Sequence, residues 1–175
     1  HKAAVKRFLD QNHITPVPGP NTSRAKYDLD ALRFVTKKYY RDKVEVRKKI
    51  QVFFNFKGGT GKTSICHQVS TLFALYGFNV LVVDCDPQAH LSHSLGMELE
   101  DDYPTLYDVI VNKVPIEDTV VKVYPGLDLI PANLSLTRLE LPLNQMPNRE
   151  RALQKTLEKV KDKYDFIFID TNPTI

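Results

Sequence analysis

The sequence predicts an α/β fold with a doubly wound, mostly parallel sheet, preceded by a small winged-helix-like α domain. Three apolar runs, 52–56, 79–83 and 166–169, have the composition of strands that are buried on both faces. The first run leads into a cluster of glycines, and each of the other two leads into an aspartate. Segments of helical length separate the runs, and strands that alternate with helices favour a parallel sheet.

The first fifty residues differ in charge from the rest of the chain. Residues 1–50 hold 13 Lys and Arg against 5 Asp and Glu, a net charge of +8, while the remainder holds 11 against 16, a net charge of −5. The change of sign predicts a boundary between an N-terminal region, 1–49, and a second domain, 50–175. A basic region on an acidic domain is what contact with nucleic acid requires, and a solvated basic linker is the alternative.

Residue patterns divide the N-terminal region into short elements. An amphipathic segment, 3–9, predicts a helix, and the proline-rich segment 14–23 predicts a turn or a wing, because proline fixes φ and lacks an N–H donor. Residues 24–27 predict an extended basic segment. Asp28 is expected to cap a helix, which the basic run 37–49 continues as a linker into the first strand.

The rest of the chain is expected to alternate helices and strands. Glycine most readily ends a helix in the left-handed conformation, so Gly77 and Gly96 mark two helix ends. The expected elements are a helix over 63–76, a shorter helix over 87–95, a helix over 105–112, a helix or edge strand over 115–123, a strand over 127–131 and a long amphipathic helix over 148–164.

A glycine-rich segment joins the first strand to the first long helix. A strand, a tight glycine turn and a helix N-terminus together bind anions, because backbone N–H groups and the helix dipole attract phosphate. Lys62 can reach the outer phosphates of a nucleotide, and the Thr63 hydroxyl can bind Mg²⁺. The predicted nucleotide-phosphate site is formed by Lys57-Gly58-Gly59-Thr60-Gly61-Lys62-Thr63-Ser64.

Three aspartates follow the two other predicted strands. Asp84 and Asp86 both stand at the end of the second strand, and Asp170 ends the last one. Because ligand sites in open α/β sheets form at the carboxyl ends of the strands, these acids are expected to face the same crevice as the glycine-rich segment.

Composition excludes several other classes of protein. Contents of 42% hydrophobic and 26% charged residues are typical of a globular chain. No apolar run approaches the ~20 residues of a membrane span, and no signal-peptide pattern begins the chain. Cys66 and Cys85 lack metal-ligand spacing, so they are expected to be reduced thiols. We therefore expect a cytoplasmic protein, and the absence of a long apolar run predicts that it does not bind membranes.

The glycine-rich segment resembles a variant of a known phosphate-binding motif. A second lysine, Lys57, precedes the glycines, and Phe56 stands where the standard motif has glycine. The form Lys-Gly-Gly-x-Gly-Lys-Thr resembles the deviant Walker A motif of the ParA/MinD/nitrogenase-iron-protein group of P-loop ATPases. The resemblance implies that Lys57 crosses a dimer interface to the partner's nucleotide and stabilises the transition state, as an arginine finger does.

The segments that carry the aspartates extend this resemblance. Asp-x-Asp-Pro-Gln at 84–88 is similar to the second signature of ParA proteins, and 165–170 resembles a Walker B strand. The resemblance implies that ATP and Mg²⁺ are the cofactors. It implies that Asp84 belongs to the magnesium network, that Asp86 positions the attacking water and that Asp170 holds the metal through water.

The N-terminal region adds a looser resemblance. Its order of helix, proline-rich turn, basic extended segment and helix resembles the winged helix-turn-helix of larger plasmid partition ATPases, which would make Arg24 and Lys26 DNA contacts. The resemblance as a whole implies a nucleoid-associated ATPase that segregates DNA, forms an ATP-dependent homodimer, responds to a ParB-type centromere-binding partner and represses its own operon. It also implies that the chain is a fragment, because a ParA-type domain needs further strands.

Three other functions share part of these features. A MinD-like membrane-cycling ATPase of cell division has the same loop and would need an amphipathic C-terminal helix. A cobyrinate-type synthetase or an iron-protein reductase also has the loop, but the reductase needs cluster cysteines, which Cys66 and Cys85 cannot supply. A transcription factor without ATPase activity leaves the loop and the aspartates unexplained.

Overall fold

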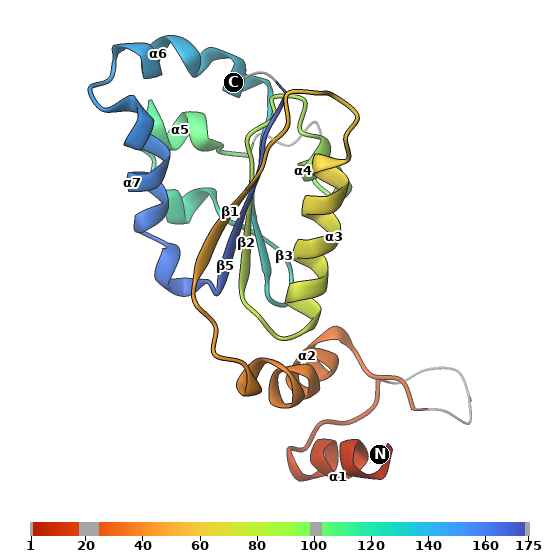
Figure 1. Ribbon diagram of the computed structural model, residues 1–175. Helices are drawn as coiled ribbons and strands as arrows, with labels where there is room; N and C mark the ends of the chain where they lie inside the picture. The colour runs from red at the N-terminus through yellow and green to blue at the C-terminus, as the bar shows by residue number, and fades with distance from the viewer. Residues whose placement is uncertain (1, 18–24, 99–102, 174–175) are drawn as a thin grey trace.

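The computed structural model describes residues 2–17, 25–98 and 103–173, which form one five-stranded sheet with helices on both faces (Figure 1). The elements are α1 (Lys2–Gln11), α2 (Leu29–Tyr39), η1 (Arg41–Lys43), β1 (Lys49–Phe53), α3 (Lys62–Leu75), β2 (Val80–Asp84), α4 (His90–Ser94), α5 (Leu106–Ile110), η2 (Ile116–Thr119), β3 (Val121–Tyr124), β4 (Leu127–Ile130), η3 (Leu134–Arg138), α6 (Glu140–Gln145), η4 (Arg149–Arg151), α7 (Ala152–Glu158), η5 (Lys161–Lys163) and β5 (Phe166–Asp170), where η marks a 3₁₀ helix.

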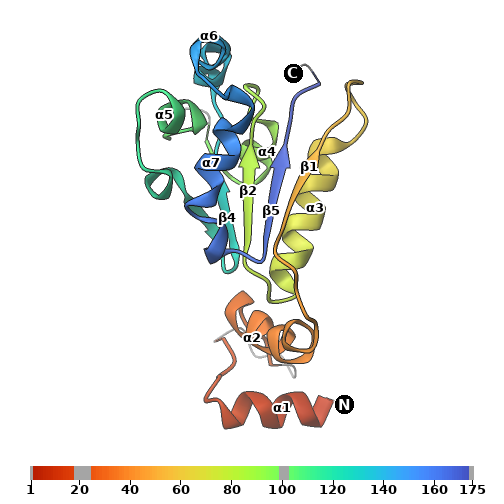
Figure 2. The same cartoon turned by 60° about the vertical axis from the view of Figure 1, so that its left-hand side comes forward.

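The sheet confirms the predicted doubly wound, mostly parallel architecture. Its strand order is β1-β5-β2-β4-β3, and every neighbouring pair is parallel except β3 with β4. One core packs α5 and α7 against the sheet around Leu81 and Ile130, and the other packs α3 and α4 against the opposite face around Val82 and Leu129. Figure 2 shows these helices on the two sides of the strands.

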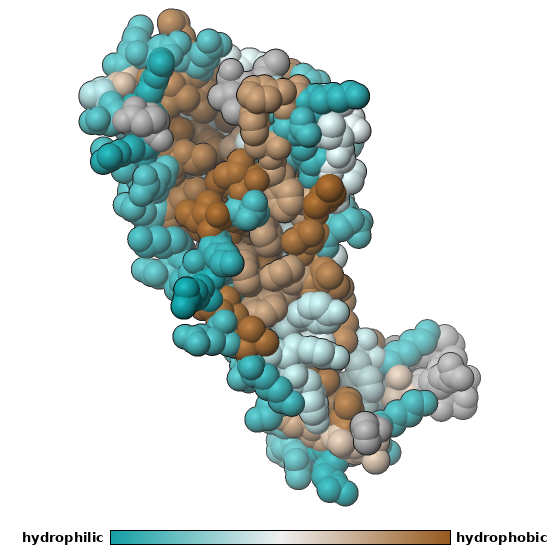
Figure 3. All heavy atoms as spheres, in the orientation of Figure 1, coloured by the Kyte–Doolittle hydropathy of each residue, from teal (hydrophilic) through white to brown (hydrophobic). Residues whose placement is uncertain are grey.

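The first strand lies at an edge of the sheet, which corrects the prediction of a buried strand over 52–56. β1 spans Lys49–Phe53 and pairs only with β5. The side chains of Ile50 and Val52 are 47% and 45% exposed. Figure 3 shows apolar side chains gathered along the middle of this face of the molecule, where β1 runs in Figure 1. Apolar composition indicated a strand, but burial depends on which strands lie beside it.

Several helix boundaries also differ from the prediction. The long helix expected over 148–164 is divided into η4, α7 and η5, and the helix expected over 87–95 is reduced to α4. The segment 115–123 contains both of the alternatives considered for it, because η2 is followed by the antiparallel edge strand β3. The basic run 37–49 does not continue the preceding helix, since α2 ends at Tyr39 and an extended segment follows η1.

The N-terminal region packs as two helices in its described parts. The predicted cap is confirmed, because Asp28 Oδ1 accepts the N–H of Ala31 at 2.8 Å. The rings of Phe8 on α1 and Phe34 on α2 stack with centroids 5.2 Å apart. Residues 2–17 and 25–48 contain these helices and η1, and no strand. The proposed DNA contact Arg24 and most of the proline-rich segment 14–23 lie outside the described residues.

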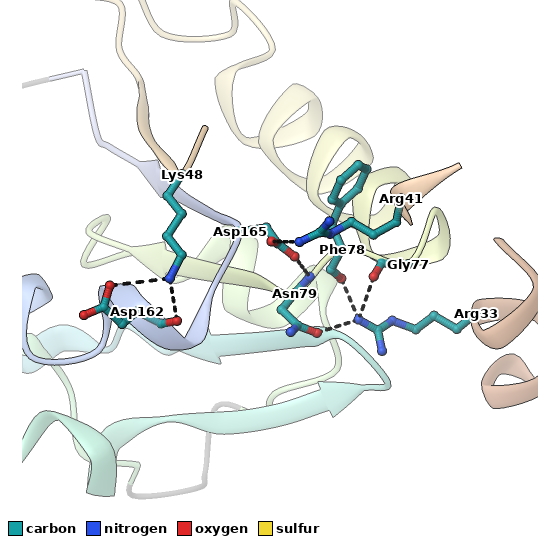
Figure 4. Close-up of polar contacts among 8 residues, drawn as sticks. All are labelled: Arg33, Arg41, Lys48, Gly77, Phe78, Asn79, Asp162 and Asp165. Atoms are coloured by element: carbon teal, nitrogen blue, oxygen red, sulfur yellow. Dashed lines mark hydrogen bonds and ion pairs between the residues drawn. The ribbon is translucent and has the colours of Figure 1, made fainter. Parts of the chain in front are cut away.

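Arg33 makes several of the hydrogen bonds that attach helix α2 to the base of the sheet domain. The Arg33 guanidinium donates to the carbonyl oxygen of Ala74 at 3.1 Å. It also donates to the carbonyl oxygen of Phe78 at 2.7 Å and to the side-chain oxygen of Asn79 at 2.7 Å (Figure 4). The first two carbonyls lie at the C-terminal end of α3 and just after it. The Ala74 carbonyl also accepts the backbone N–H of Gly77 at 3.0 Å, so Arg33 is a second donor there, and the Phe78 carbonyl that it bonds lies just beyond the helix end.

A second set of contacts fixes the C-terminal half of α2 and the segment after it. Arg41 forms an ion pair of 2.8 Å with Asp165, whose other oxygen accepts the N–H of Asn79 at 2.9 Å (Figure 4). The Thr36 hydroxyl donates to the carbonyl of Leu75 at 2.6 Å. These bonds place the N-terminal helices at the end of the sheet opposite to the glycine-rich segment (Figure 1).

Candidate nucleotide-binding site

Strand register brings the predicted site residues to one edge of the sheet. Phe53, the last residue of β1, is paired with Asp170 of β5, and Asp170 is paired in turn with Asp84 of β2. The glycine-rich segment leaves β1 at this point, so it begins directly beside the two aspartates. The three carboxyl ends form the kind of crevice in which parallel α/β sheets bind ligands.

The glycine-rich segment has a backbone that requires glycine at two positions. Gly59 has φ of +69° and Gly61 has φ of +83°, which are left-handed values that other residues rarely adopt. The turn is held by the Thr60 hydroxyl, which donates to the carbonyl of Lys57 at 3.2 Å. Gly61 is the N-cap residue of α3, so the first helical residues are Lys62, Thr63 and Ser64.

Helix α3 directs its N-terminus at this edge. The first N–H groups of a helix have no intrahelical acceptor, and the helix dipole adds partial positive charge there. In α3 these N–H groups belong to Lys62, Thr63 and Ser64. Lys57 and Ser64 are exposed, while Lys62 and Thr63 are half-buried. The arrangement can bind a chain of phosphates along the segment 57–64.

Asp170 is a buried carboxylate without a hydrogen-bonding partner among the described residues. It is fully buried, and neither side-chain oxygen accepts a hydrogen bond there. Burial raises its pKa above the ordinary value, and the charge of Asp86 adds to the shift. The Thr63 hydroxyl, Lys62 and the N–H of Thr171 lie near enough to oppose the shift, although none completes a well-formed hydrogen bond to either oxygen. An unpaired buried carboxylate is costly, so a cation at this position would relieve it.

Asp84 has the opposite character, because protein donors already use both of its oxygens. Oδ1 accepts the N–H of Asp86 at 3.0 Å, and Oδ2 accepts the N–H and the hydroxyl of Ser92 at 2.9 and 2.7 Å. Burial raises the pKa of Asp84 to about 6, and the bonds from Ser92 and Asp86 oppose the shift. Sequence reasoning did not identify Ser92.

The remaining site residues surround this pair of acids. Asp86 is half-buried, and its Oδ1 accepts the N–H of Gln88 at 3.0 Å.

Burial raises the pKa of the Cys85 thiol to about 12 and raises that of Cys66 further, so both stay protonated near neutral pH. The predicted DNA contact Lys26 is exposed and stands two residues before Asp28, the N-cap of α2.

The oxygen atoms at the site fit a Mg²⁺ ion whose other ligands would be substrate phosphates and water. No group of three or more His, Cys, Asp or Glu side chains within residues 2–17, 25–98 and 103–173 could hold a metal ion by itself. Magnesium bound with nucleotides takes only one or two protein oxygens, together with phosphates and water. Asp170 and Thr63 supply oxygens of this kind, and the unpaired Asp170 carboxylate is the observation that supports the fit.

The sheet order, the glycine-rich segment and the aspartates at its edge define a P-loop nucleotide-binding protein. Residues 48–175 match the family model described as AAA domain (AAA_31), so the chain belongs to that family, among the ParA-type partition ATPases. The match begins close to the predicted domain start at residue 50.

Curated relatives include proteins of chromosome and plasmid partition. The chain is 34% identical over 171 residues to the cell division protein PomZ of Myxococcus xanthus, covering 97% of this chain and 54% of the relative. It is 36% identical over 130 residues to the chromosome partitioning protein ParA of Caulobacter vibrioides, covering 73% and 49%. The chain thus spans about half the length of the curated relatives it matches.

Solved structures show the same fold. A plasmid partition protein of Borrelia burgdorferi is 30% identical, with a TM-score of 0.62 over 73% of this chain and 57% of that one. Cobyrinic acid a,c-diamide synthase of Mycobacterium smegmatis, solved with an ATP analogue and magnesium, is 30% identical, with a TM-score of 0.70 over 73% and 52%. Among the described residues, no helix is both long enough and apolar enough to span a membrane.

Proposed function

We propose that the protein is a DNA segregation ATPase that binds ATP with Mg²⁺ and hydrolyses it to ADP and phosphate. The observation that carries the proposal is the buried Asp170 carboxylate, which makes no well-formed hydrogen bond within the described residues and lies beside Lys62 and Thr63, where the phosphate loop ends and α3 begins. A nucleotide–magnesium complex would supply the missing cation. The ATP analogue and magnesium in a related structure support this assignment.

Each residue of the site has a distinct proposed role. The backbone of Gly58 to Gly61 and the N-terminus of α3 bind the phosphates, and Lys62 neutralises their charge. Thr63 and Asp170 hold the magnesium, which neutralises charge that develops on the phosphoryl oxygens. Asp86 orients the attacking water, and Asp84 belongs to the magnesium network. Positioning and electrostatics carry most of the catalysis in such phosphoryl transfer.

The wider partition cycle is also proposed. ATP binding forms a homodimer in which Lys57 of each copy reaches the nucleotide of the other. The dimer binds DNA, a ParB-type centromere-binding partner stimulates hydrolysis, and hydrolysis releases the DNA. The chromosome and plasmid partitioning relatives support this cycle, which places the protein on the nucleoid. Arg24 and Lys26 are proposed as contacts to DNA phosphates and as part of operator binding for autorepression.

DNA binding by the full-length protein tests the partition role. With a non-hydrolysable ATP analogue, affinity for a random duplex is expected to exceed that with ADP and to fall steeply with salt, because bound phosphates release counterions. The double substitution Arg24→Ala, Lys26→Ala is expected to lower the salt slope by about one to two. Fluorescence anisotropy across a salt series measures both effects. Equal binding with either nucleotide would contradict the role, and an unchanged slope would return the basic N-terminal region to a solvated linker.

Asp86→Ala is expected to separate binding from hydrolysis. The substitution removes the group that orients water and leaves the phosphate loop intact, so hydrolysis falls about a hundredfold or more. ATP affinity is expected to change by less than about threefold, because binding depends on the loop. Stopped-flow binding and phosphate release on the same samples measure the two quantities. Asp170→Ala is the contrast, since it should weaken the magnesium dependence of binding.

Lys57→Ala is expected to affect the dimer and spare nucleotide binding. Lys57 is exposed, in keeping with a role outside its own loop. The variant should bind ATP as a monomer and fail to form the ATP-dependent dimer. Sedimentation velocity with a non-hydrolysable analogue distinguishes the two states, and a normal dimer with normal turnover would make Lys57 an ordinary surface lysine.

Placement of the division site is a second candidate function. The match to the cell division protein PomZ extends over 97% of this chain, and so includes most of the N-terminal region as well as the ATPase domain. Loss of the protein would then displace septa without raising replicon loss, which microscopy and plating distinguish. A MinD-like, membrane-cycling form of this role predicts ATP-dependent flotation with anionic vesicles.

A further inference from the structure

Ser92, in the middle of α4, joins the Asp84 carboxylate to the backbone that follows β4. Its hydroxyl donates to Asp84 Oδ2 at 2.7 Å and accepts the N–H of Ala132 at 3.0 Å. The backbone N–H of Ser92 donates to the same oxygen of Asp84 at 2.9 Å. Asp84 is fully buried and Ser92 is 2% exposed, so water cannot readily replace these bonds.

The other oxygen of Asp84 organises the turn that carries Asp86. Asp84 Oδ1 accepts the N–H of Asp86 at 3.0 Å, and the carbonyl of Asp86 accepts the N–H of Ala89 at 2.8 Å. Ala89 has φ of +54°, a left-handed value that is uncommon for a residue with a side chain. The turn therefore depends on bonds at both of its ends, and Asp84 makes the bond at the first.

The geometry points to Ser92 as a positioning residue: it fixes the Asp84 carboxylate against β4, and through Asp84 it fixes the turn that presents Asp86. A serine hydroxyl supplies one donor and can accept as well, and both capacities are used here. Ser92 has no place in the roles assigned above. The inference deepens the proposed function, because its effect on hydrolysis rests on the role given to Asp86.

Removal of the hydroxyl is expected to slow hydrolysis more than it weakens binding. In Ser92→Ala, Asp84 loses one donor and the N–H of Ala132 loses its acceptor, while the phosphate loop is untouched. We expect kcat of the full-length protein to fall about tenfold to a hundredfold, the range that misplacement of a catalytic group produces. KM for ATP should change by less than about threefold. Ser92→Thr keeps a hydroxyl and should recover most of kcat.

Ser94 supplies a matched control on the same helix. Its exposed hydroxyl donates to the carbonyl of His90 at 2.8 Å and not to Asp84, whose oxygens are bonded by Asp86 and Ser92. Ser94→Ala removes the same atom from α4, so kcat should stay within about twofold of the parent. A double-mutant cycle adds a second control. If Ser92 acts through Asp84, Ser92→Ala should cost little more kcat in an Asp84→Asn background.

Hydrogen exchange tests the inference without nucleotide. In the nucleotide-free protein, Ser92→Ala should raise amide exchange in the peptide that spans 84–92, and Ser94→Ala should not. Ser92→Cys fills the space of the hydroxyl with a slightly larger thiol, which is a weak hydrogen-bond donor. We expect it to act like Ser92→Ala, which would show that packing alone does not hold the turn. It also replaces Ser92→Ala if that variant fails to fold.

The outcomes separate this inference from the proposed function. If Ser92→Ala exchanges and turns over like the parent, Ser92 is a packing residue and the inference is wrong. Additive losses in the double-mutant cycle would also overturn it, since Ser92 would then act independently of Asp84. If the parent protein does not hydrolyse ATP, the proposed function fails, while the exchange measurement still decides whether Ser92 holds the turn.

Discussion

Lys62→Ala is expected to abolish tight nucleotide binding in the full-length protein. Lys62 is the first residue of α3 and belongs to the glycine-rich segment. It is half-buried and lies near Asp170. It is the lysine that the motif directs at the outer phosphates, and hydrogen bonds to charged groups are each worth about 1.5–3 kcal/mol. Loss of this charge also removes one of the neighbours that oppose the rise of the pKa of Asp170. We expect the affinity for ATP with Mg²⁺ to fall at least about a hundredfold, or about 2.7 kcal/mol.

Isothermal titration calorimetry with ATP and Mg²⁺ measures this loss directly. Lys122→Ala is the matched control, because Lys122 is an exposed lysine on β3, on the strand farthest from β1 in the sheet. The affinity of Lys122→Ala for ATP with Mg²⁺ should equal that of the parent protein. Melting curves of both variants establish that the fold is intact. An unchanged affinity in Lys62→Ala would remove the phosphate loop from the proposed mechanism.

Local patterns in the sequence predicted the sheet and the ends of its strands. Apolar runs identified β2 and β5 and overlapped the last two residues of β1, which begins at Lys49, and the residues that follow each run identified the crevice where Asp84 and Asp170 lie paired. These features depend on neighbours in the sequence, because a strand end, a glycine turn and a helix start are consecutive. The two left-handed glycines, Gly59 and Gly61, fall inside the segment that composition had selected.

The features that prediction missed depend on residues far apart in the sequence. β1 is exposed because it has β5 on one side alone, and the strand order is not a local property. The bond from the N–H of Ala132 to Ser92 spans 40 residues, so no spacing rule indicates it. The difference between Asp84, which is fully bonded, and Asp170, which is not, likewise arises only when the strands are side by side.

The attachment of α2 is another long-range feature, and it predicts a large effect on stability. Arg33 bonds to groups 41 to 46 residues away in the sequence. Two glycines allow this close approach: a Cβ on Gly77 would lie 2.7 Å from Lys37 Cα, and one on Gly126 would lie 2.0 Å from Arg33 Nε. Both glycines also have left-handed φ, at +93° and +83°. A larger residue would therefore strain the backbone at either position; at Gly77 it would push the backbone of α2 away, and at Gly126 it would displace the Arg33 side chain.

Arg33→Ala is expected to destabilise the full-length protein and to release the N-terminal helices. The substitution leaves the carbonyl of Phe78 without its side-chain donor, and removes hydrogen bonds to the side chain of Asn79 and to the carbonyl of Ala74, which still accepts the N–H of Gly77. We expect the free energy of unfolding to fall by about 2–3 kcal/mol, which lowers the melting temperature by roughly 5–10 °C. Lys38→Ala, on an exposed position of the same helix, should change it by less than about 0.5 kcal/mol.

Two measurements together decide whether Arg33 attaches α2 or merely adds stability. Thermal melting gives the size of the loss, and limited trypsin digestion at residues 47–49 reports whether the segment after α2 has become accessible. Gly126→Ala adds a coupling test: part of its cost comes from contact with the Arg33 side chain, so it should cost less in an Arg33→Ala background. If Arg33→Ala melts and is cleaved like Lys38→Ala, the contacts of Arg33 do not hold α2 in place. If only the melting temperature falls, Thr36 and the Arg41–Asp165 ion pair are sufficient to keep α2 attached.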